Sequence, residues 1–507
     1  MLRQRGPPTR TAVGGALVTV AGSPPARQSR PTESWWQFAL TIFLTGYFFC
    51  FNWGSLRVHF ALDDLGNMAH YYEYSSWQLV LSNFLPWRGD NRPLGALFYI
   101  PIYHFAGLNP VPYQAAMLLI LLATVYCSYR FARLLGGSEL AAALLALVCC
   151  YHGGLANLYY NAAFVYDGLC CLFYLASFIY YLRIRNRGQL LGPGQTVLFL
   201  MLFLCALNSK EMAVSIPVML LIYEWIYHRP KWNRPALLEW VRGPARVSLI
   251  AAVLNVLDIY PKIAGPTALA NAEGFHPVFK LERIYDFDVV AFRDLFFSWG
   301  TTPERWQIAG TWILLAWLAW RRADRPVLRF LFWFLIVAPL PIEFLVGKSQ
   351  ACLALVMVGL AAFAAVVFAD AVETIAGFLA KGFRWPPWKR RLLVCAMVAP
   401  VVFIWTRDQR YLRLEVGRAP MNTLGFETWD LIQQLRASGF HPRPNSRVAF
   451  LNDPFVDHTD MYRLVRLWLH DKSVNVHTAG QGPLPAEEMA KTDYIFTVEN
   501  RKVIRLK

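Results

Sequence analysis

The segment that decides the fold covers residues 35–64 and reads WWQFALTIFLTGYFFCFNWGSLRVHFALDD. No Asp, Glu, Lys or Arg occurs from Ser34 to Leu56, so this stretch is long enough and apolar enough to cross a bilayer as a helix. The segment ends on two adjacent carboxylates, Asp63 and Asp64. Because ionised groups next to lipid must be solvated, paired or neutralised, an acidic pair here indicates chemistry at a membrane surface.

The rest of the chain repeats this apolar pattern. Of its 507 residues, 56% are hydrophobic and only 16% are charged, whereas soluble domains carry about 25% charged residues. The composition therefore excludes a soluble protein and predicts a mainly α-helical, polytopic bundle of eleven spans. The predicted spans are residues 35–55, 111–135, 139–158, 162–182, 195–209, 211–228, 245–264, 306–320, 327–346, 350–370 and 391–406.

The net charge of +16 has a simple explanation in this setting. Lys and Arg gather in the loops at one set of span ends, as in the cluster Arg183, Arg185 and Arg187, which is the pattern of cytoplasmic loops. The charge therefore reflects membrane orientation, and we expect no nucleic-acid partner. The nine cysteines lie in apolar segments without the spacing of a zinc site, so they imply neither disulfides nor a metal centre.

Three regions follow from this pattern. Residues 1–34 are rich in Arg, Pro, Gly and Ser and predict a disordered cytoplasmic tail, and residues 35–406 form the membrane domain. Residues 407–507 have a soluble texture and predict a small extracytoplasmic α/β module. Its expected elements are helices at 426–437 and 461–469 and strands at 447–451, 473–477, 494–498 and 503–506. We expect the protein to lie in a bacterial inner (plasma) membrane.

Two clusters near the predicted outer surface suggest a reaction centre. Asp63 or Asp64 could act as a general base on an acceptor hydroxyl, although such a pair could also serve only to cap a helix. Arg92 precedes Pro93, Leu94 and Gly95 and opens an apolar stretch. An Arg at a helix N-terminus is suited to bind an anion, but an Arg at the interface can also extend its side chain to the lipid headgroups.

Further charged residues fall on the same predicted face. Lys210 and Glu211 sit in a tight turn between two apolar runs, where Lys210 could bind a phosphate and Glu211 orient it, or the charges could form an internal pair that closes the turn. His152 and Asp167 lie in or next to one outer loop. Lys348 is isolated at a span end, where it needs an anionic partner such as a lipid-linked phosphate or a lipid headgroup.

Together these motifs resemble a GT-C type integral membrane glycosyltransferase. The order of the motifs is similar to that in the membrane part of protein O-mannosyltransferases and their bacterial relatives (glycosyltransferase family 39-like). The resemblance extends from about Trp35 to Ala371 and rests on the motifs Asp63-Asp64, Arg92-Pro93-Leu94, His152 with Asp167 at the family's spacing, and Ser209-Lys210-Glu211. The chain differs where Asn157 replaces a frequent acidic residue and where Lys348 stands near the position of a usual Arg.

The resemblance implies a mannosyltransferase-like enzyme of the cell envelope that transfers a sugar from a polyprenyl-phosphate donor to a protein, lipid or glycan acceptor. In that case Asp63 or Asp64 activates the acceptor, and we favour Asp64. Arg92, Lys210, Glu211 and Lys348 would hold the donor phosphate, and His152, Asn157 and Asp167 would contact substrate. A divalent cation is an open possibility in such enzymes.

Two other functions remain open. Charges within membrane proteins also mark transport pathways, so a transporter or flippase for lipid-linked or anionic substrates is the main alternative. The second alternative is a catalytically inactive subunit with the same fold, because Asn157 replaces an acid.

Overall fold

The computed structural model describes residues 33–73, 92–264, 276–295, 302–322, 324–345, 350–414, 418–452, 454–455 and 460–507. The predicted tail at 1–34 falls almost entirely outside these residues. The chain divides into two compact units, Met1–Phe43 and Leu44–Lys507. The described part of the first unit is the start of helix α1 (Glu33–Asn52), and the second unit holds all other elements.

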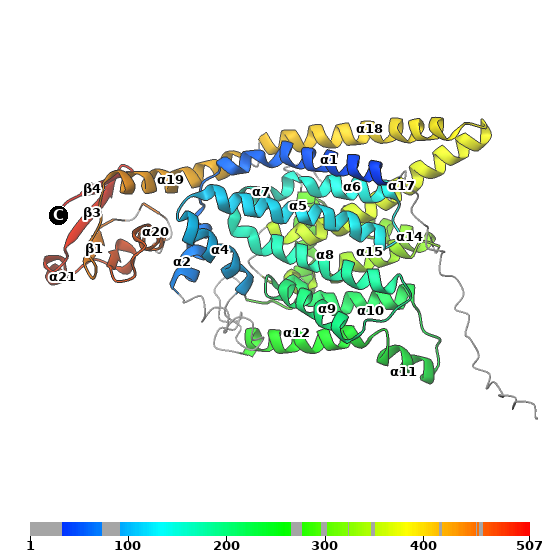
Figure 1. Cartoon of the computed structure of the whole chain (residues 1–507), viewed down its shortest axis with the longest axis horizontal. Helices are drawn as coiled ribbons and strands as arrows, with labels where there is room; N and C mark the ends of the chain where they lie inside the picture. The colour runs from blue at the N-terminus through cyan, green and yellow to red at the C-terminus, as the bar shows by residue number, and fades with distance from the viewer. Residues whose placement is uncertain are drawn as a thin grey trace, which may run out of the picture. The chain divides into compact units, whose positions relative to one another are not determined.

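The described elements before the C-terminal sheet are almost entirely helical (Figure 1). After α1 they are η1 (Trp53–Arg57), α2 (Leu62–Glu73), α4 (Pro93–Ala106), α5 (Pro110–Leu134), α6 (Glu139–Cys150), η2 (Gly153–Leu155), α7 (Ala156–Tyr160), η3 (Ala162–Phe164), α8 (Val165–Arg185), α9 (Pro193–Leu207), η4 (Glu211–Ser215), α10 (Ile216–Tyr227), α11 (Arg234–Arg242), α12 (Arg246–Ala264), α13 (Leu281–Leu295), α14 (Arg305–Arg321), α15 (Pro326–Val337), α16 (Leu340–Glu343), η6 (Gln350–Leu353), α17 (Ala354–Gly382), α18 (Pro387–Leu412) and α19 (Arg418–Ala437).

In the described residues, each of the eleven predicted spans overlaps one helix or a run of two or three consecutive helical elements. Among the described residues, six helices are long and apolar enough to cross a membrane, or up to eight if each of two bent pairs is one span. The bent pairs are α6 with η2 and α7, at 47°, and α11 with α12, at 61°. The protein is therefore an integral multi-pass membrane protein, while the count of eleven stays a prediction.

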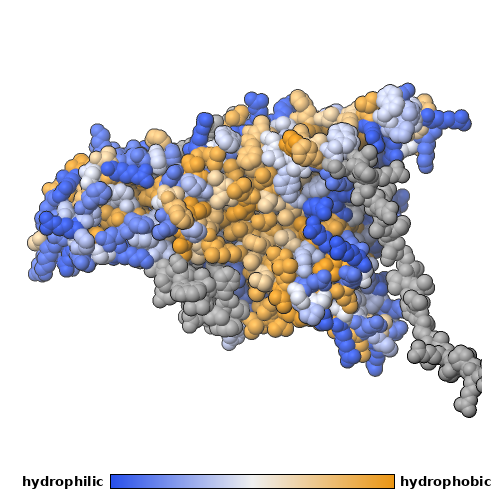
Figure 2. Space-filling model, viewed as in Figure 1, coloured by the Kyte–Doolittle hydropathy of each residue, from blue (hydrophilic) through white to orange (hydrophobic). Residues whose placement is uncertain are grey.

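The bundle core is built around α5, α8 and α17. Helix α5 packs against α6 and α8, and α17 packs against α6, α15 and α18. Asn109 starts α5 by accepting the Val111 N–H at 3.2 Å, and Ser138 starts α6 by accepting the Ala141 N–H at 3.3 Å. On the face shown in Figure 2, apolar residues gather over the middle of the bundle and hydrophilic residues over the C-terminal sheet and around α11.

The C-terminal region has the α/β structure that its sequence predicts. Its sheet has the order β2-β1-β3-β4, in which β1 is parallel to β2 and β3, and β4 is antiparallel to β3. The predicted helices and strands are confirmed as α19, β1 (Arg447–Phe450), α20 (Asp460–Leu469), β2 (Asn475–Thr478), β3 (Tyr494–Glu499) and β4 (Lys502–Arg505), with short η8 (Ala479–Gln481) and α21 (Ala486–Ala490) between the strands. Helix α18 continues to Leu412, six residues past the predicted domain boundary at 406.

A buried ion pair ties α8 to α10. Arg185 Nε lies 2.6 Å from Glu224 Oε1, and its Nη2 donates to Oε2 at 2.8 Å, so the contact is bidentate. The Tyr181 hydroxyl also donates to Glu224, at 2.7 Å. The Glu224 side chain is fully buried, so its charge depends on Arg185 for compensation.

We expect Glu224→Ala to lower stability by about 3–5 kcal/mol, because it leaves the Arg185 charge buried without its partner. The double variant Arg185→Met with Glu224→Leu should recover much of that loss. Thermal unfolding in one detergent would measure both. The matched control is Glu139→Ala, which breaks the half-exposed Arg133–Glu139 pair and should cost at most about 1 kcal/mol. Equal losses in the two single variants would contradict this expectation.

Candidate active site

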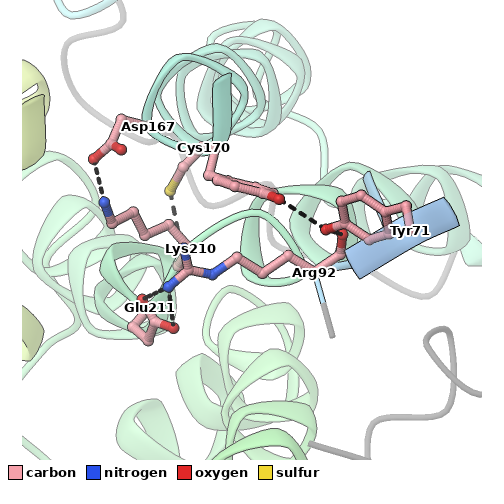
Figure 3. Close-up of polar contacts among 7 residues, drawn as sticks. Tyr71, Arg92, Asp167, Cys170, Lys210 and Glu211 are labelled. Atoms are coloured by element: carbon pink, nitrogen blue, oxygen red, sulfur yellow. Dashed lines mark hydrogen bonds and ion pairs between the residues drawn. The ribbon is translucent and has the colours of Figure 1, made fainter. Parts of the chain in front are cut away.

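Two ion pairs form the centre of the candidate site (Figure 3). Lys210 Nζ lies 2.6 Å from Asp167 Oδ1, and Arg92 Nη2 lies 3.2 Å from Glu211 Oε1. Since Lys210 and Glu211 are adjacent in the chain, the two pairs belong to one cluster that joins α4, α8 and the turn before η4. The structure thus brings together four charged residues that the sequence places in three separate regions.

Local structure holds each charge in place. Arg92 is the N-cap residue of α4, and Asp167 lies in the first turn of α8, where the helix dipole favours a negative charge. The turn that carries Lys210 is fixed by two contacts. Ser209 Oγ donates to the Cys205 carbonyl at 2.8 Å, and Cys170 Sγ donates to the Lys210 carbonyl at 3.6 Å.

The two cations differ in accessibility. The Lys210 and Asp167 side chains are 12% and 2% exposed, whereas the Arg92 side chain is 41% exposed. Burial acts to lower the pKa of Lys210, but nearby groups, chiefly the Asp167 carboxylate, together outweigh it and leave that pKa above its ordinary value. Lys210 is therefore a permanently charged group held by Asp167, and Arg92 presents the more open face to a ligand.

Two tyrosines that the sequence reasoning did not single out complete the cluster. The Arg92 guanidinium lies over the ring of Tyr166, 5.0 Å from its centroid. The Tyr71 hydroxyl donates to the Arg92 carbonyl at 2.8 Å and lies 2.9 Å from the Tyr166 hydroxyl. Tyr71 comes from α2, which also carries the acidic pair, so this contact connects α2 to the ion pairs.

The acidic pair is divided between two environments. Asp63 is exposed, whereas Asp64 is 1% exposed and accepts the Ala61 N–H at 3.0 Å through Oδ2. Asp64 occupies the third position of α2 and reaches back to the residue before the helix, which is one half of a capping box. The capping interpretation raised for the pair therefore applies to Asp64.

Burial also changes the acidity of Asp64. It raises the pKa of this carboxyl from 3.8 to about 7; the Ala61 amide acts in the opposite direction, and the nearby Asp63 charge adds to the rise. The Asp64 carboxyl interacts electrostatically with Tyr99 and with Tyr166, the tyrosine whose ring lies against the Arg92 guanidinium.

His152 and Asp167 lie in different environments, although the sequence places them in or next to one loop. His152 Nδ1 accepts the Gly154 N–H at 3.2 Å, and its ring meets Trp405 edge to face at 5.5 Å. It lines an apolar cavity of about 310 Å³ between α6, α17 and α18, while Asp167 pairs with Lys210. His152 and Asp167 therefore do not pair with each other in the structure, and the substrate contacts expected of them stay predictions.

The roles expected of two further residues stay predictions. Asn157 lies in α7 and is partly buried, and its carbonyl accepts the Asn161 N–H at 3.0 Å. Lys348 falls outside the described residues. In the part of the chain that the structure describes, no group of three or more His, Cys, Asp or Glu side chains is arranged to hold a metal ion.

The helical bundle with its charged cluster belongs to a membrane protein with the GT-C glycosyltransferase fold. The structure of ArnT from Cupriavidus metallidurans bound to undecaprenyl phosphate aligns with a TM-score of 0.50 at 15% identity, over 87% of this chain and 86% of that one. An Archaeoglobus fulgidus oligosaccharyltransferase tethered with an acceptor peptide aligns with a TM-score of 0.46 at 10% identity, over 88% of this chain and 64% of that one. No protein-family model and no curated protein sequence matches the chain. The likeness to ArnT confirms the predicted fold.

The raised pKa of Asp64 predicts a pH-dependent stability. Because the folded-state pKa lies above the unfolded value of 3.8, folding favours the protonated acid. This contribution is fully present below the unfolded pKa and is lost as pH rises through about 7. Relative to Asp64→Asn, which stays neutral and keeps an acceptor for the Ala61 amide, the wild type should therefore lose melting temperature progressively between about pH 4 and pH 7 and change little above about pH 8.

Melting temperatures of both proteins across this pH range would test the expectation. Asp63→Asn is the control, because it changes the neighbouring carboxylate and leaves Asp64 able to titrate. A constant difference between the wild type and Asp64→Asn at all pH values would contradict it.

Proposed function

We propose that the protein is a membrane glycosyltransferase that moves a sugar from a polyprenyl-phosphate donor to an acceptor on the extracytoplasmic side of the membrane. A mannosyl or related hexosyl donor and a protein, lipid or glycan acceptor of the cell envelope fit this proposal. The observation that carries it is the cluster of Arg92 and Lys210 beside α2, the helix with the acidic pair. The bound undecaprenyl phosphate of ArnT is consistent with a lipid-phosphate ligand here.

The chemistry needs fixed cations and a base. The acceptor hydroxyl oxygen attacks the anomeric carbon of the sugar, and the bond from that carbon to the phosphate oxygen breaks, with its electron pair leaving on the lipid phosphate. The negative charge on that phosphate grows as the bond breaks, so preorganised cations stabilise the transition state more than the ground state. Arg92 would contact the phosphate directly, and Lys210 would add a fixed positive charge behind it.

The acceptor proton must go to a carboxylate within hydrogen-bond reach. Asp63 is the exposed member of the pair, whereas Asp64 is buried and caps α2. We therefore assign the base to Asp63, in place of the preference for Asp64 drawn from sequence. In this assignment Asp64 holds the start of α2 and so sets the direction in which Asp63 points.

Sugar transfer from a panel of polyprenyl-phosphate sugars, measured with purified protein in nanodiscs, tests the proposal. We expect Asp63→Asn to lower kcat by about 10²–10⁴-fold, the range typical for loss of a general base. Asp64→Asn should keep most of the transfer activity, because the amide oxygen can still accept the Ala61 N–H. Asp430→Asn, the same change in a carboxylate of α19 that accepts from Gln434, is the control for the substitution itself.

The remaining outcomes are equally informative. Loss of transfer in Asp64→Asn alone, with folding intact, would move the base to Asp64. Full activity in both variants would place the base elsewhere. No transfer by the wild type from any donor to any tested acceptor would contradict the enzyme and favour a transporter or an inactive subunit.

A further inference from the structure

The packing around Arg92 has a feature that ion pairing alone does not explain. Tyr71 donates its hydroxyl proton to the Arg92 carbonyl, so the short contact between the two phenols is a donation from Tyr166 to Tyr71. The ring of Tyr166 lies under the guanidinium of the same arginine. Tyr71 thus contacts the backbone of Arg92, and Tyr166 contacts its guanidinium group.

A glycine permits this arrangement. Gly95 lies in α4, and a Cβ atom there would come within 2.3 Å of Tyr166 Cε1 and 2.4 Å of the Tyr71 hydroxyl. Glycine inside a helix is less favourable than alanine, so its presence needs a packing reason. Here the reason is the close approach of the two phenols to α4.

The ion pair with Glu211 does not by itself orient the guanidinium. Glu211 contacts only Nη2, at 3.2 and 3.5 Å. A single nitrogen contact leaves the plane of the group free to rotate, and a contact with the ring face removes that freedom. Together the Glu211 carboxylate and the Tyr166 ring fix the plane of the Arg92 guanidinium.

We infer that Tyr71 and Tyr166 are positioning residues that present Arg92 to the phosphate of a lipid-linked ligand, with Gly95 setting their distance from α4. This inference rests on the proposed function for the identity of the ligand, a polyprenyl phosphate. We call Tyr71, Tyr166 and Gly95 the tyrosine platform. The inference predicts that a change in this platform weakens phosphate binding and leaves acceptor binding unchanged.

The test measures undecaprenyl phosphate binding in nanodiscs, together with the KM values for donor and acceptor. We expect Tyr166→Leu and Gly95→Ala to weaken undecaprenyl phosphate binding about tenfold and to raise the donor KM, with the acceptor KM unchanged. Tyr166→Phe keeps the ring face and should bind within about twofold of the wild type. This rescue by the ring alone separates positioning of Arg92 from loss of a hydrogen bond.

A double-variant experiment tests whether Tyr166→Leu weakens undecaprenyl phosphate binding by changing the position of Arg92. Arg92→Lys keeps the charge but loses the planar group that stacks on the ring. If Tyr166 acts through Arg92, adding Tyr166→Leu to Arg92→Lys should weaken binding little further. Additive losses would overturn the inference.

Two matched controls report on general packing loss. Tyr181→Leu removes an equally buried tyrosine at the other end of α8, and Gly377→Ala adds a Cβ where no atom lies within 4 Å. Neither should change undecaprenyl phosphate binding selectively. A loss in Tyr181→Leu equal to that in Tyr166→Leu would overturn the inference.

The binding readout also separates this inference from the proposed enzyme activity. Wild-type protein that binds undecaprenyl phosphate through Arg92 and Tyr166 but transfers no sugar would contradict the enzyme and support the platform. Wild-type transfer with unchanged binding in Tyr166→Leu and Gly95→Ala would support the enzyme and overturn the platform.

Discussion

The pairing of Lys210 with Asp167 is the interaction on which the candidate site depends. Both side chains are nearly buried at the edge of an apolar bundle, where breaking a pair leaves an uncompensated charge at a cost of about 3–5 kcal/mol. The start of α8 is therefore held against the turn before η4. Because Glu211 follows Lys210 directly, the same constraint places a carboxylate where Arg92 meets it, and α4 is joined to the cluster.

The sequence predicted the helical segments and the general place of the site, because both follow from where charge is tolerated in a membrane. Apolar runs predict helices, and charges predicted to lie at span ends on one side are expected to converge, as Arg92, Lys210 and Asp167 do in the structure. The different environments of Asp63 and Asp64 could not be predicted in this way. Adjacent residues at a helix start point in different directions, and only the packing of α2 decides which one is buried.

Other features of the site depend on distances that no local pattern encodes. Tyr71 and Tyr166 are separated by almost a hundred positions, and each is unremarkable in a chain rich in aromatic residues. Gly95 was the available signal, since a glycine just inside an apolar helix suggests a close approach. The separate surroundings of His152 and Asp167 have a local cause: η2, α7 and η3 lie between them in the chain, and His152 lies against α18.

The C-terminal region contacts the elements that carry the candidate base. The ring of His59, just before α2, stacks on Trp429 of α19 at 4.7 Å. Helix α20 packs on α2, and the Tyr103 hydroxyl of α4 donates to the Leu467 carbonyl at 2.6 Å. These contacts pack the C-terminal region against α2 and α4, so that region helps to hold the two helices that carry the acidic pair and Arg92.

The four charges of the central cluster cancel, since two cations each face one carboxylate. A cluster of this kind has little net charge, so it would itself contribute little to long-range electrostatic attraction of anions from solution. A ligand would have to arrive by lateral diffusion in the bilayer and find its phosphate contacts at short range. Such a centre would ignore abundant soluble phosphates and respond to the concentration of its ligand in the membrane.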